Sequence, residues 1–176
     1  MKKASSAQPI FRYATAQTAI GPILAVATDK GLCALRLLEG TAVKNLMREI
    51  AREHPPADWV EDGSALRPYM SKISQVVEGH LDASKIPLDL YGTPFQKKVW
   101  STLLRVPWGK TLSYQELARK VGKPRAVRAV ANACARNPIA FVVPCHRILR
   151  SDGSLGGYYW GPSRKQQLLR REREES

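Results

Sequence analysis

The sequence predicts an α/β first half with a small antiparallel sheet, followed by a mostly helical second half. Three observations support this division. Short β-branched segments lie close together near the N-terminus, and helices with capping signals follow later in the chain. The charge is also uneven: residues 1–91 carry 11 Lys and Arg against 10 Asp and Glu, whereas residues 92–176 carry 17 against 5. We therefore expect two domains, 1–91 and 92–176.

The composition favours an intracellular globular protein. The 44% hydrophobic content is ordinary for such proteins. No apolar run approaches a membrane span, and the first residues lack the apolar core of a signal peptide. Three cysteines suggest reduced thiols. We expect a cytoplasmic protein that binds no membrane. The net charge of +13 favours a nucleic-acid partner, although a basic surface kept for solubility is the alternative.

We expect residues 1–91 to form a scaffold domain. Three strand-like segments, 10–16, 21–28 and 31–37, predict an antiparallel meander. We expect a helix capped by Thr41 that ends near His54, before two prolines, and a second helix from Ser64 to about His80. Residues 88–90 suggest one more short strand. Cys33, His54 and His80 show no metal-ligand spacing, so no metal is expected.

Capping boxes mark the helices of the second half. Thr93 with Gln96, and Ser113 with Glu116, each predict a helix start. The second of these helices should end at Gly122, and Pro124 should open the next almost at once. Two short helices joined in this way are typical of a helix-turn-helix, so we expect a winged-helix-like domain. A third box, Ser163 with Gln166, predicts the final helix.

The helix expected over residues 124–136 has an unusual composition. One face carries side chains that should point to the core, and small alanines separate it from a polar face. Small side chains would let the backbone approach a DNA groove closely. The alternative is a packing helix with a solvated charged face. The core face is Val127, Val130 and Cys134, the polar face is Arg125, Arg128 and Asn132, and the alanines include Ala126 and Ala129.

The candidate nucleophile follows an apolar run. Residues 139–143 should form a buried strand or extended segment, which Pro144 ends. Cys145 would then lie beside His146 and Arg147, in a basic environment that lowers a thiol pKa. The alternative is that Cys145 is a small buried hydrophobe. Glu172, late in the final helix, could orient His146 as in a Cys–His–acid relay, or could belong to a charged surface tail.

Together these motifs resemble one family. Residues 144–147, the helix over 125–130, and Asn137 with Pro138 look like the O6-alkylguanine-DNA alkyltransferases, also called methylated-DNA–protein-cysteine methyltransferases. Residues 92–96 and 158–172 fit the same family, and the likeness is strongest to the C-terminal half of the bacterial adaptive-response protein Ada and to Ogt-type proteins. The resemblance implies that the first half has a ribonuclease-H-like fold.

The resemblance also implies an activity. The helix-turn-helix would enter the minor groove of double-stranded DNA, and the damaged nucleotide would flip out of the stack. Cys145 would then take the alkyl group from O6 of guanine, or from O4 of thymine, once and irreversibly. Arg128 would fill the vacated space, and Tyr114 would contact the flipped nucleotide. His146 would remove the thiol proton while Glu172 holds it. We expect a monomer that needs no cofactor.

The remaining site residues are assigned by the same resemblance. They would surround the flipped base and its alkyl group, either as pocket walls or through their backbone. These residues are Cys134, Asn137, Ala140, Ile148, Tyr158 and Tyr159. Two other functions stay open: a protein that binds alkyl lesions without reacting, and a Cys–His hydrolase, for which residues 142–144 offer no obvious oxyanion hole.

Overall fold

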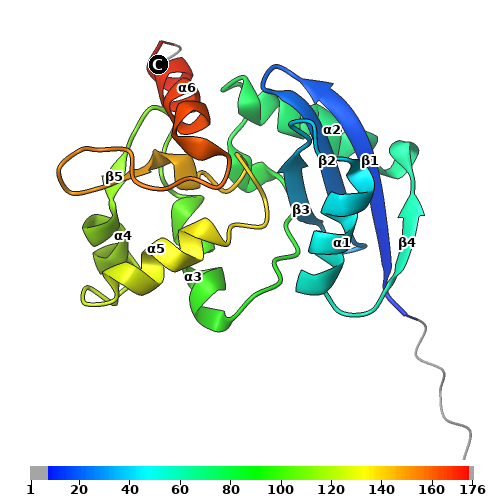
Figure 1. Cartoon of the computed structure of the whole chain (residues 1–176), viewed down its shortest axis with the longest axis horizontal. Coiled ribbons are helices and arrows are strands. Elements are labelled where there is room, and N and C mark those ends of the chain that lie inside the picture. The colour runs from blue at the N-terminus through cyan, green and yellow to red at the C-terminus, as the bar shows by residue number, and fades with distance from the viewer. Residues whose placement is uncertain (1–7, 175–176) are drawn as a thin grey trace, which may run out of the picture.

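The computed structural model describes residues 8–174, in which a sheet with its helices lies beside a helical half (Figure 1). The sheet has the order β3-β2-β1-β4. Its first three strands, β1 (Ile10–Thr18), β2 (Gly21–Ala27) and β3 (Leu32–Leu37), form the predicted antiparallel meander. The fourth, β4 (Asp58–Glu61), pairs parallel to β1, so the sheet is mixed rather than purely antiparallel. Four residues, of which two are charged, gave too weak a pattern to predict β4.

Two helices cover the two faces of this sheet (Figure 1). Helix α1 (Val43–Glu53) packs through its apolar side chains on one face, with Leu24 and Val26 of β2. Helix α2 (Gly63–Val77) packs on the other, with Ile23 and Ala25. Because β2 is buried on both faces, its sequence is continuously apolar instead of alternating.

The ends of the first-half helices differ from expectation. The N-cap of α1 is Ala42, which makes no side-chain cap, so Thr41 is not the capping residue. The side chain of Asp62 caps α2 by accepting from the Ala65 amide at 2.9 Å, and the helix therefore begins at Gly63. A 3-10 turn, η1 (Ala83–Lys85), follows. The expected strand at 88–90 reduces to a single bridge between Leu88 and Leu32.

The second half contains the predicted capped helices. Both capping boxes are confirmed, at α3 (Pro94–Leu103) and α4 (Tyr114–Lys120). Helix α5 (Val127–Ala135) begins later than predicted because residues 124–125 form a turn. Helix α6 (Gly161–Glu174) begins before Ser163, so the third box does not mark its start. The short strands β5 (Leu112–Ser113) and β6 (Ile148–Leu149) pair parallel.

The apolar run before the candidate nucleophile is not a strand. Only Ile139 forms a bridge, with Leu35 of β3, and residues 140–142 turn. Phe141 has a φ of 64°, and the Val143 amide donates to the Ile139 carbonyl at 3.0 Å. A 3-10 helix, η2 (Cys145–Arg147), follows. A short, fully buried apolar run carries no periodicity that separates a strand from a buried turn, which explains the error.

This turn joins the two halves. The Leu35 amide donates to the Pro138 carbonyl at 2.9 Å, and the Ala140 amide donates to the Leu35 carbonyl at 3.2 Å. The buried guanidinium of Arg36 also donates to the Pro138 carbonyl. One core cluster continues from the sheet to α6. Among residues 8–174, no helix is both long enough and apolar enough to span a bilayer.

Gly31 lies where the backbone next to β3 approaches Pro87 closely. Gly31 has a φ of 155°, and an added Cβ would lie 2.6 Å from the Pro87 carbonyl oxygen. Gly31→Ala should therefore lower the free energy of unfolding in urea by about 3 kcal/mol. Gly153→Ala, with a φ of 81° but open space around its Cβ, should cost only about 1 kcal/mol for the left-handed backbone. Equal losses would contradict the close approach.

Candidate active site

Cys145 lies in the wall of a cavity of about 320 Å³. The residue is 6% exposed, at the first position of η2. The cavity takes its walls from α5, from the loop that precedes α6, and from Tyr114 at the start of α4. The other lining residues are Ala131, Asn132, Cys134, Ala135, Asn137, Gly157, Tyr158, Tyr159 and Trp160.

Asn137 connects the turn to the sulfur. Its side-chain amide donates to the Val143 carbonyl at 2.7 Å and to the Sγ of Cys145 at 3.1 Å, while its oxygen accepts from the Ile139 amide at 3.0 Å. Burial raises the pKa of the Cys145 thiol, and the Asn137 hydrogen bond and the Lys165 charge offset this only in part. The sequence-based expectation of a lowered thiol pKa is therefore wrong, because desolvation outweighs the basic neighbours.

His146 and Glu172 form a buried pair. The Nε2 of His146 lies 2.6 Å from the Oε1 of Glu172, and the residues are 2% and 3% exposed. A carboxylate only accepts, so Nε2 carries the proton and Nδ1 keeps a free lone pair. Nδ1 has no hydrogen-bond partner among the described residues. Burial lowers the pKa of His146, which favours the neutral imidazole. A neutral ring with a free Nδ1 lone pair can act as a base.

Glu172 binds more than the imidazole. Its oxygens accept from the Nε of Arg147 at 3.1 and 2.9 Å, and from the Gly109 amide at 3.1 Å. Burial would raise its pKa, but the hydrogen bonds and charges of His146 and Arg147 lower it to about 2. The alternative of a surface residue is wrong, because Glu172 falls on the buried face of α6.

Sequence reasoning missed Lys165. Lys165 is fully buried, and its ammonium group donates to the carbonyls of Ile148 and Leu155. Its Nζ also lies 5.9 Å from the ring centroid of Tyr114. Burial lowers the pKa of this ammonium. The spacing of residues along the helix could have predicted that Lys165 is buried. It lies on the buried face of α6, which also carries Leu168, Leu169 and Glu172.

Aromatic side chains close the cavity. Burial raises the pKa of Tyr114 to about 12, so it remains a proton donor. The ring centroid of Trp160 lies 5.5 Å from that of Tyr158 and 4.9 Å from that of Tyr159. Tyr159 is 61% exposed, at the outer rim. These rings provide stacking surfaces for a planar ligand.

Two predicted pocket residues do not line this cavity. Ala140 is fully buried in the turn that pairs with β3. Ile148 is fully buried where β6 pairs with Leu112 of β5, and its carbonyl already accepts from Lys165. Both side chains belong to the hydrophobic core cluster.

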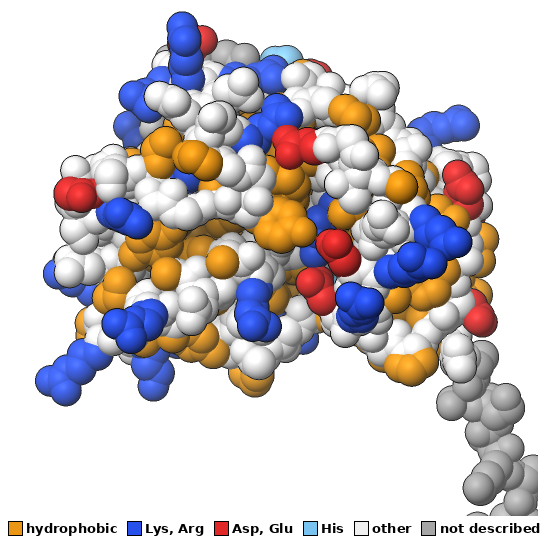
Figure 2. All heavy atoms as spheres, viewed as in Figure 1, with side chains coloured by type: hydrophobic (Ala, Val, Ile, Leu, Met, Phe, Trp, Pro, Cys, Tyr) orange, Lys and Arg blue, Asp and Glu red, His pale blue; other side chains and the backbone are white. Residues whose placement is uncertain are grey.

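The polar face of α5 is open to solvent. Arg128, Ala129 and Asn132 of the helix are exposed, as is Arg125 in the turn before it, while the N-cap residue Ala126 is half-buried. Val127, predicted to face the core, is half-buried: it packs against the core and also lines a groove with Arg125, Arg128 and Arg150. Figure 2 shows a hollow with hydrophobic side chains between α5 and the loop before α6, bordered by Lys and Arg. A basic helix thus lies beside the cavity that holds the thiol.

Together, fold and site define a class of proteins that present a buried cysteine next to a basic helix. Family comparison is specific. Residues 11–90 match the model of the 6-O-methylguanine DNA methyltransferase ribonuclease-like domain, and residues 94–174 match that of the 6-O-methylguanine DNA methyltransferase DNA binding domain. The chain therefore belongs to the methylated-DNA–protein-cysteine methyltransferase family.

Relatives of known function support this membership. The chain is 43% identical over 163 residues to the bifunctional transcriptional activator/DNA repair enzyme Ada of Escherichia coli, covering 93% of this chain but 46% of that protein. It thus spans about half the length of Ada. It is 41% identical over 160 residues to the methylated-DNA–protein-cysteine methyltransferase of Methanosarcina barkeri, covering 91% of this chain and 96% of that one.

Solved structures share the whole fold. The O6-methylguanine methyltransferase of Mycobacterium tuberculosis is 36% identical, with a TM-score of 0.78 over 94% of each chain. The same organism's OGT in complex with DNA gives a TM-score of 0.76 at 36% identity, over 95% of this chain and 94% of that one. The ribonuclease-like domain and the helical DNA-binding domain are thus common to these proteins.

The low pKa of Glu172 predicts how stability depends on pH. An unfolded glutamate titrates near 4.5 and the folded one near 2, so the folded carboxylate contributes stability above pH about 5 that is lost as the pH falls toward 2. The shift corresponds to about 3 kcal/mol. Glu172→Gln should remove this part of the pH dependence in urea unfolding curves. Parallel curves for both proteins between pH 5 and 2 would contradict it.

Proposed function

We propose that the protein repairs DNA by direct, irreversible and stoichiometric alkyl transfer. Cys145 would accept the group from O6-alkylguanine, and from O4-alkylthymine, in double-stranded DNA. One observation carries this proposal: the sulfur lines a cavity of about 320 Å³ that α5, the helix carrying Arg128, also lines. A flipped purine with its alkyl group could reach the sulfur from DNA bound along that helix.

Helix α5 would enter the minor groove. Its alanines, Ala126 and Ala129 among them, let the backbone come close, while Arg125 and Asn132 contact the DNA. Arg128 would fill the space that the flipped nucleotide leaves. Flipping costs roughly a few kcal/mol, least for a damaged base pair. The exposure of these side chains on one face supports this orientation.

In the proposed reaction, the proton lost by the Cys145 thiol is matched by the proton that the departing guanine gains. The free Nδ1 of His146 accepts the thiol proton through a water molecule. Glu172 stabilises the imidazolium that forms. The Cys145 sulfur attacks the alkyl carbon, forming the S–C bond while the C–O6 bond breaks. Tyr114 donates a proton to the departing guanine and recovers one, through water, from the imidazolium of His146, which returns to its neutral form. Because the pKa of the Cys145 thiol is raised, the thiol is protonated at rest, and His146 removes its proton only as the reaction proceeds.

Chemistry limits the protein to one turnover. The product is a neutral thioether, and no side chain of the site can displace carbon from it. Each molecule carries a complete site, so we expect it to act as a monomer without a cofactor. We also place the reaction in the cytoplasm, where thiols remain reduced; the three cysteines are unbridged in the structure.

The remaining site residues would hold the sulfur and the flipped base in place. Asn137 would hold the turn and the sulfur, Cys134 would contact the alkyl group, and Tyr158 would form a pocket wall with the Tyr159 backbone reading the base. Ile148 would act through its backbone only, and Ala140 would act indirectly, by holding the turn before Cys145 through its hydrogen bond to the Leu35 carbonyl. We further propose that residues 1–91 support the site and residues 92–176 bind DNA, since the positive charge is concentrated in the latter.

A protein that only binds the lesion is the second candidate. The raised pKa of the Cys145 thiol favours it, because a protonated thiol is a poor nucleophile. It predicts duplex affinity without a change in mass. The two candidates therefore differ in one observable, the fate of the alkyl group.

Exposure to duplex DNA that contains O6-methylguanine should place one methyl group on the Cys145 peptide, read by mass spectrometry. Cys145→Ser should stay unmodified and leave the lesion intact, whereas Cys134→Ser should still react. An unmodified Cys145 peptide beside intact lesion would exclude transfer and leave the binding-only function.

Arg128→Ala should slow repair of the duplex by roughly ten- to a hundredfold, because nothing then holds the base out of the stack. The reaction with free O6-benzylguanine base, which needs no flipping, should keep its rate in single-turnover kinetics. Arg119→Ala, at an exposed position in the last turn of α4, is the matched control and should leave both rates unchanged. Equal slowing of both substrates by Arg128→Ala would contradict the assignment.

A further inference from the structure

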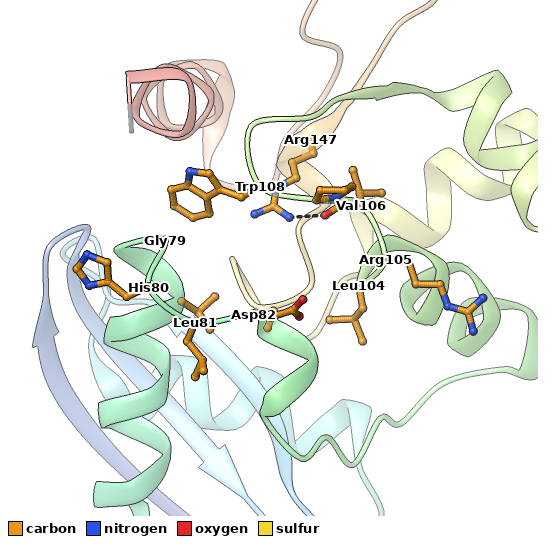
Figure 3. A pocket seen from close by; sticks show the side chains of 12 residues that line it. Gly79, His80, Leu81, Asp82, Leu104, Arg105, Val106, Trp108 and Arg147 are labelled. Carbon is orange, nitrogen blue, oxygen red and sulfur yellow. Dashed lines mark hydrogen bonds between the residues drawn. The ribbon is translucent and has the colours of Figure 1, made fainter. Parts of the chain in front are cut away.

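A second cavity, also of about 320 Å³, lies at the junction of the two halves (Figure 3). One wall comes from the end of α2 and the following residues, and the other from the connection between α3 and β5. This volume is within the range of small-molecule sites. The cavity differs from the lesion cavity in its residues, and the proposed repair reaction does not use it. The guanidinium of Arg147 reaches it from η2.

Arg147 brings a buried donor to this cavity. Its side chain is 9% exposed. Its Nε donates to Glu172, and its Nη1 donates to the Val106 carbonyl at 2.5 Å. None of the hydrogen bonds that the guanidinium makes within residues 8–174 uses Nη2. Nη2 is not among the buried side-chain atoms that lack a partner, so it is open to the cavity, where a ligand oxygen can accept from it.

Asp82 supplies an acceptor from the opposite half. Figure 3 shows it across the cavity from Arg147. Its Oδ1 accepts from the Ser84 amide at 2.7 Å, and the hydrogen bonds of Ser84, with smaller contributions from the charges of Lys85 and Arg147, lower its pKa. The carboxylate is therefore ionised, and it disfavours an anionic ligand while it accepts from an N–H group.

The walls between these groups suit a flat ligand. The indole ring of Trp108 lies with its centroid 5.6 Å from the Cζ of Arg147. Gly79 approaches the same ring so closely that a Cβ there would lie 3.0 Å from it. Leu81 and Leu104 add apolar surface. The Trp108 ring and the two leucines make the walls between the donor and the acceptor largely apolar, as in sites for small heterocycles.

We propose that this cavity is a second binding site, for a neutral planar ligand with an amide edge, such as a lactam or cyclic urea. The ligand carbonyl accepts from Nη2 of Arg147, and the adjacent N–H donates to Asp82. A neutral ligand fits because Glu172 already balances the charge of Arg147. Since the same guanidinium holds Glu172, the ligand would be linked to the His146 pair through one side chain.

Uracil is a suitable probe, because it carries this edge, and 1,3-dimethyluracil is its matched control without N–H donors. In ¹H–¹⁵N correlation spectra, uracil should give saturable shifts at the Trp108 indole and the Gly79 amide. Asp82→Ala should weaken binding at least about tenfold. Asp62→Ala removes a comparable capping carboxylate away from the cavity and should leave binding unchanged. Ala83→Leu, which narrows the cavity, should also weaken binding.

Any one of several results would overturn the proposal: no saturable shift up to the solubility limit, equal binding of 1,3-dimethyluracil, or tighter binding of inorganic phosphate. Unchanged affinity in both Asp82→Ala and Ala83→Leu would do the same. The experiment contains no DNA and does not involve Cys145. Its failure therefore leaves the proposed repair function untouched, and failure of the repair function leaves this site untouched.

Discussion

The buried carboxylate of Glu172 is the interaction on which the site depends. It accepts from His146, Arg147 and the Gly109 amide, and thereby joins α6, η2 and the loop before β5. A carboxylate without such partners would not remain charged at 3% exposure. Its partners in turn keep fixed orientations because the carboxylate is there. The tautomer of His146 follows from this arrangement.

The turn at residues 137–144 provides the second constraint. It pairs with the edge of β3, so the ribonuclease-like half holds the segment that carries the nucleophile. Asn137 extends that support to the sulfur through a single side chain. The first half therefore contributes to the chemistry through position, although none of residues 8–91 lines the cavity that holds Cys145.

Local signals in the sequence predicted much of this structure. The capping boxes at Thr93 and Ser113 placed α3 and α4, because a cap is a contact between near neighbours. The family motif brought Cys145, His146, Tyr114 and Asn137 into one region. Features that depend on distant partners were missed. Lys165 and Arg147 acquire their roles only when carbonyls and a carboxylate from elsewhere surround them. The thiol pKa was misjudged because burial cannot be read from neighbouring residues.

The protonation of His146 tests the account most directly. Labelled with ¹⁵N, the ring should show the neutral form at pH 7, with the proton on Nε2 and a pKa below the ordinary 6.5. Glu172→Gln should disturb this tautomer preference, since an amide can also donate to the ring. An imidazolium at pH 7, or a proton on Nδ1 in the unmutated protein, would contradict the proposal that Glu172 holds His146 ready to accept the thiol proton.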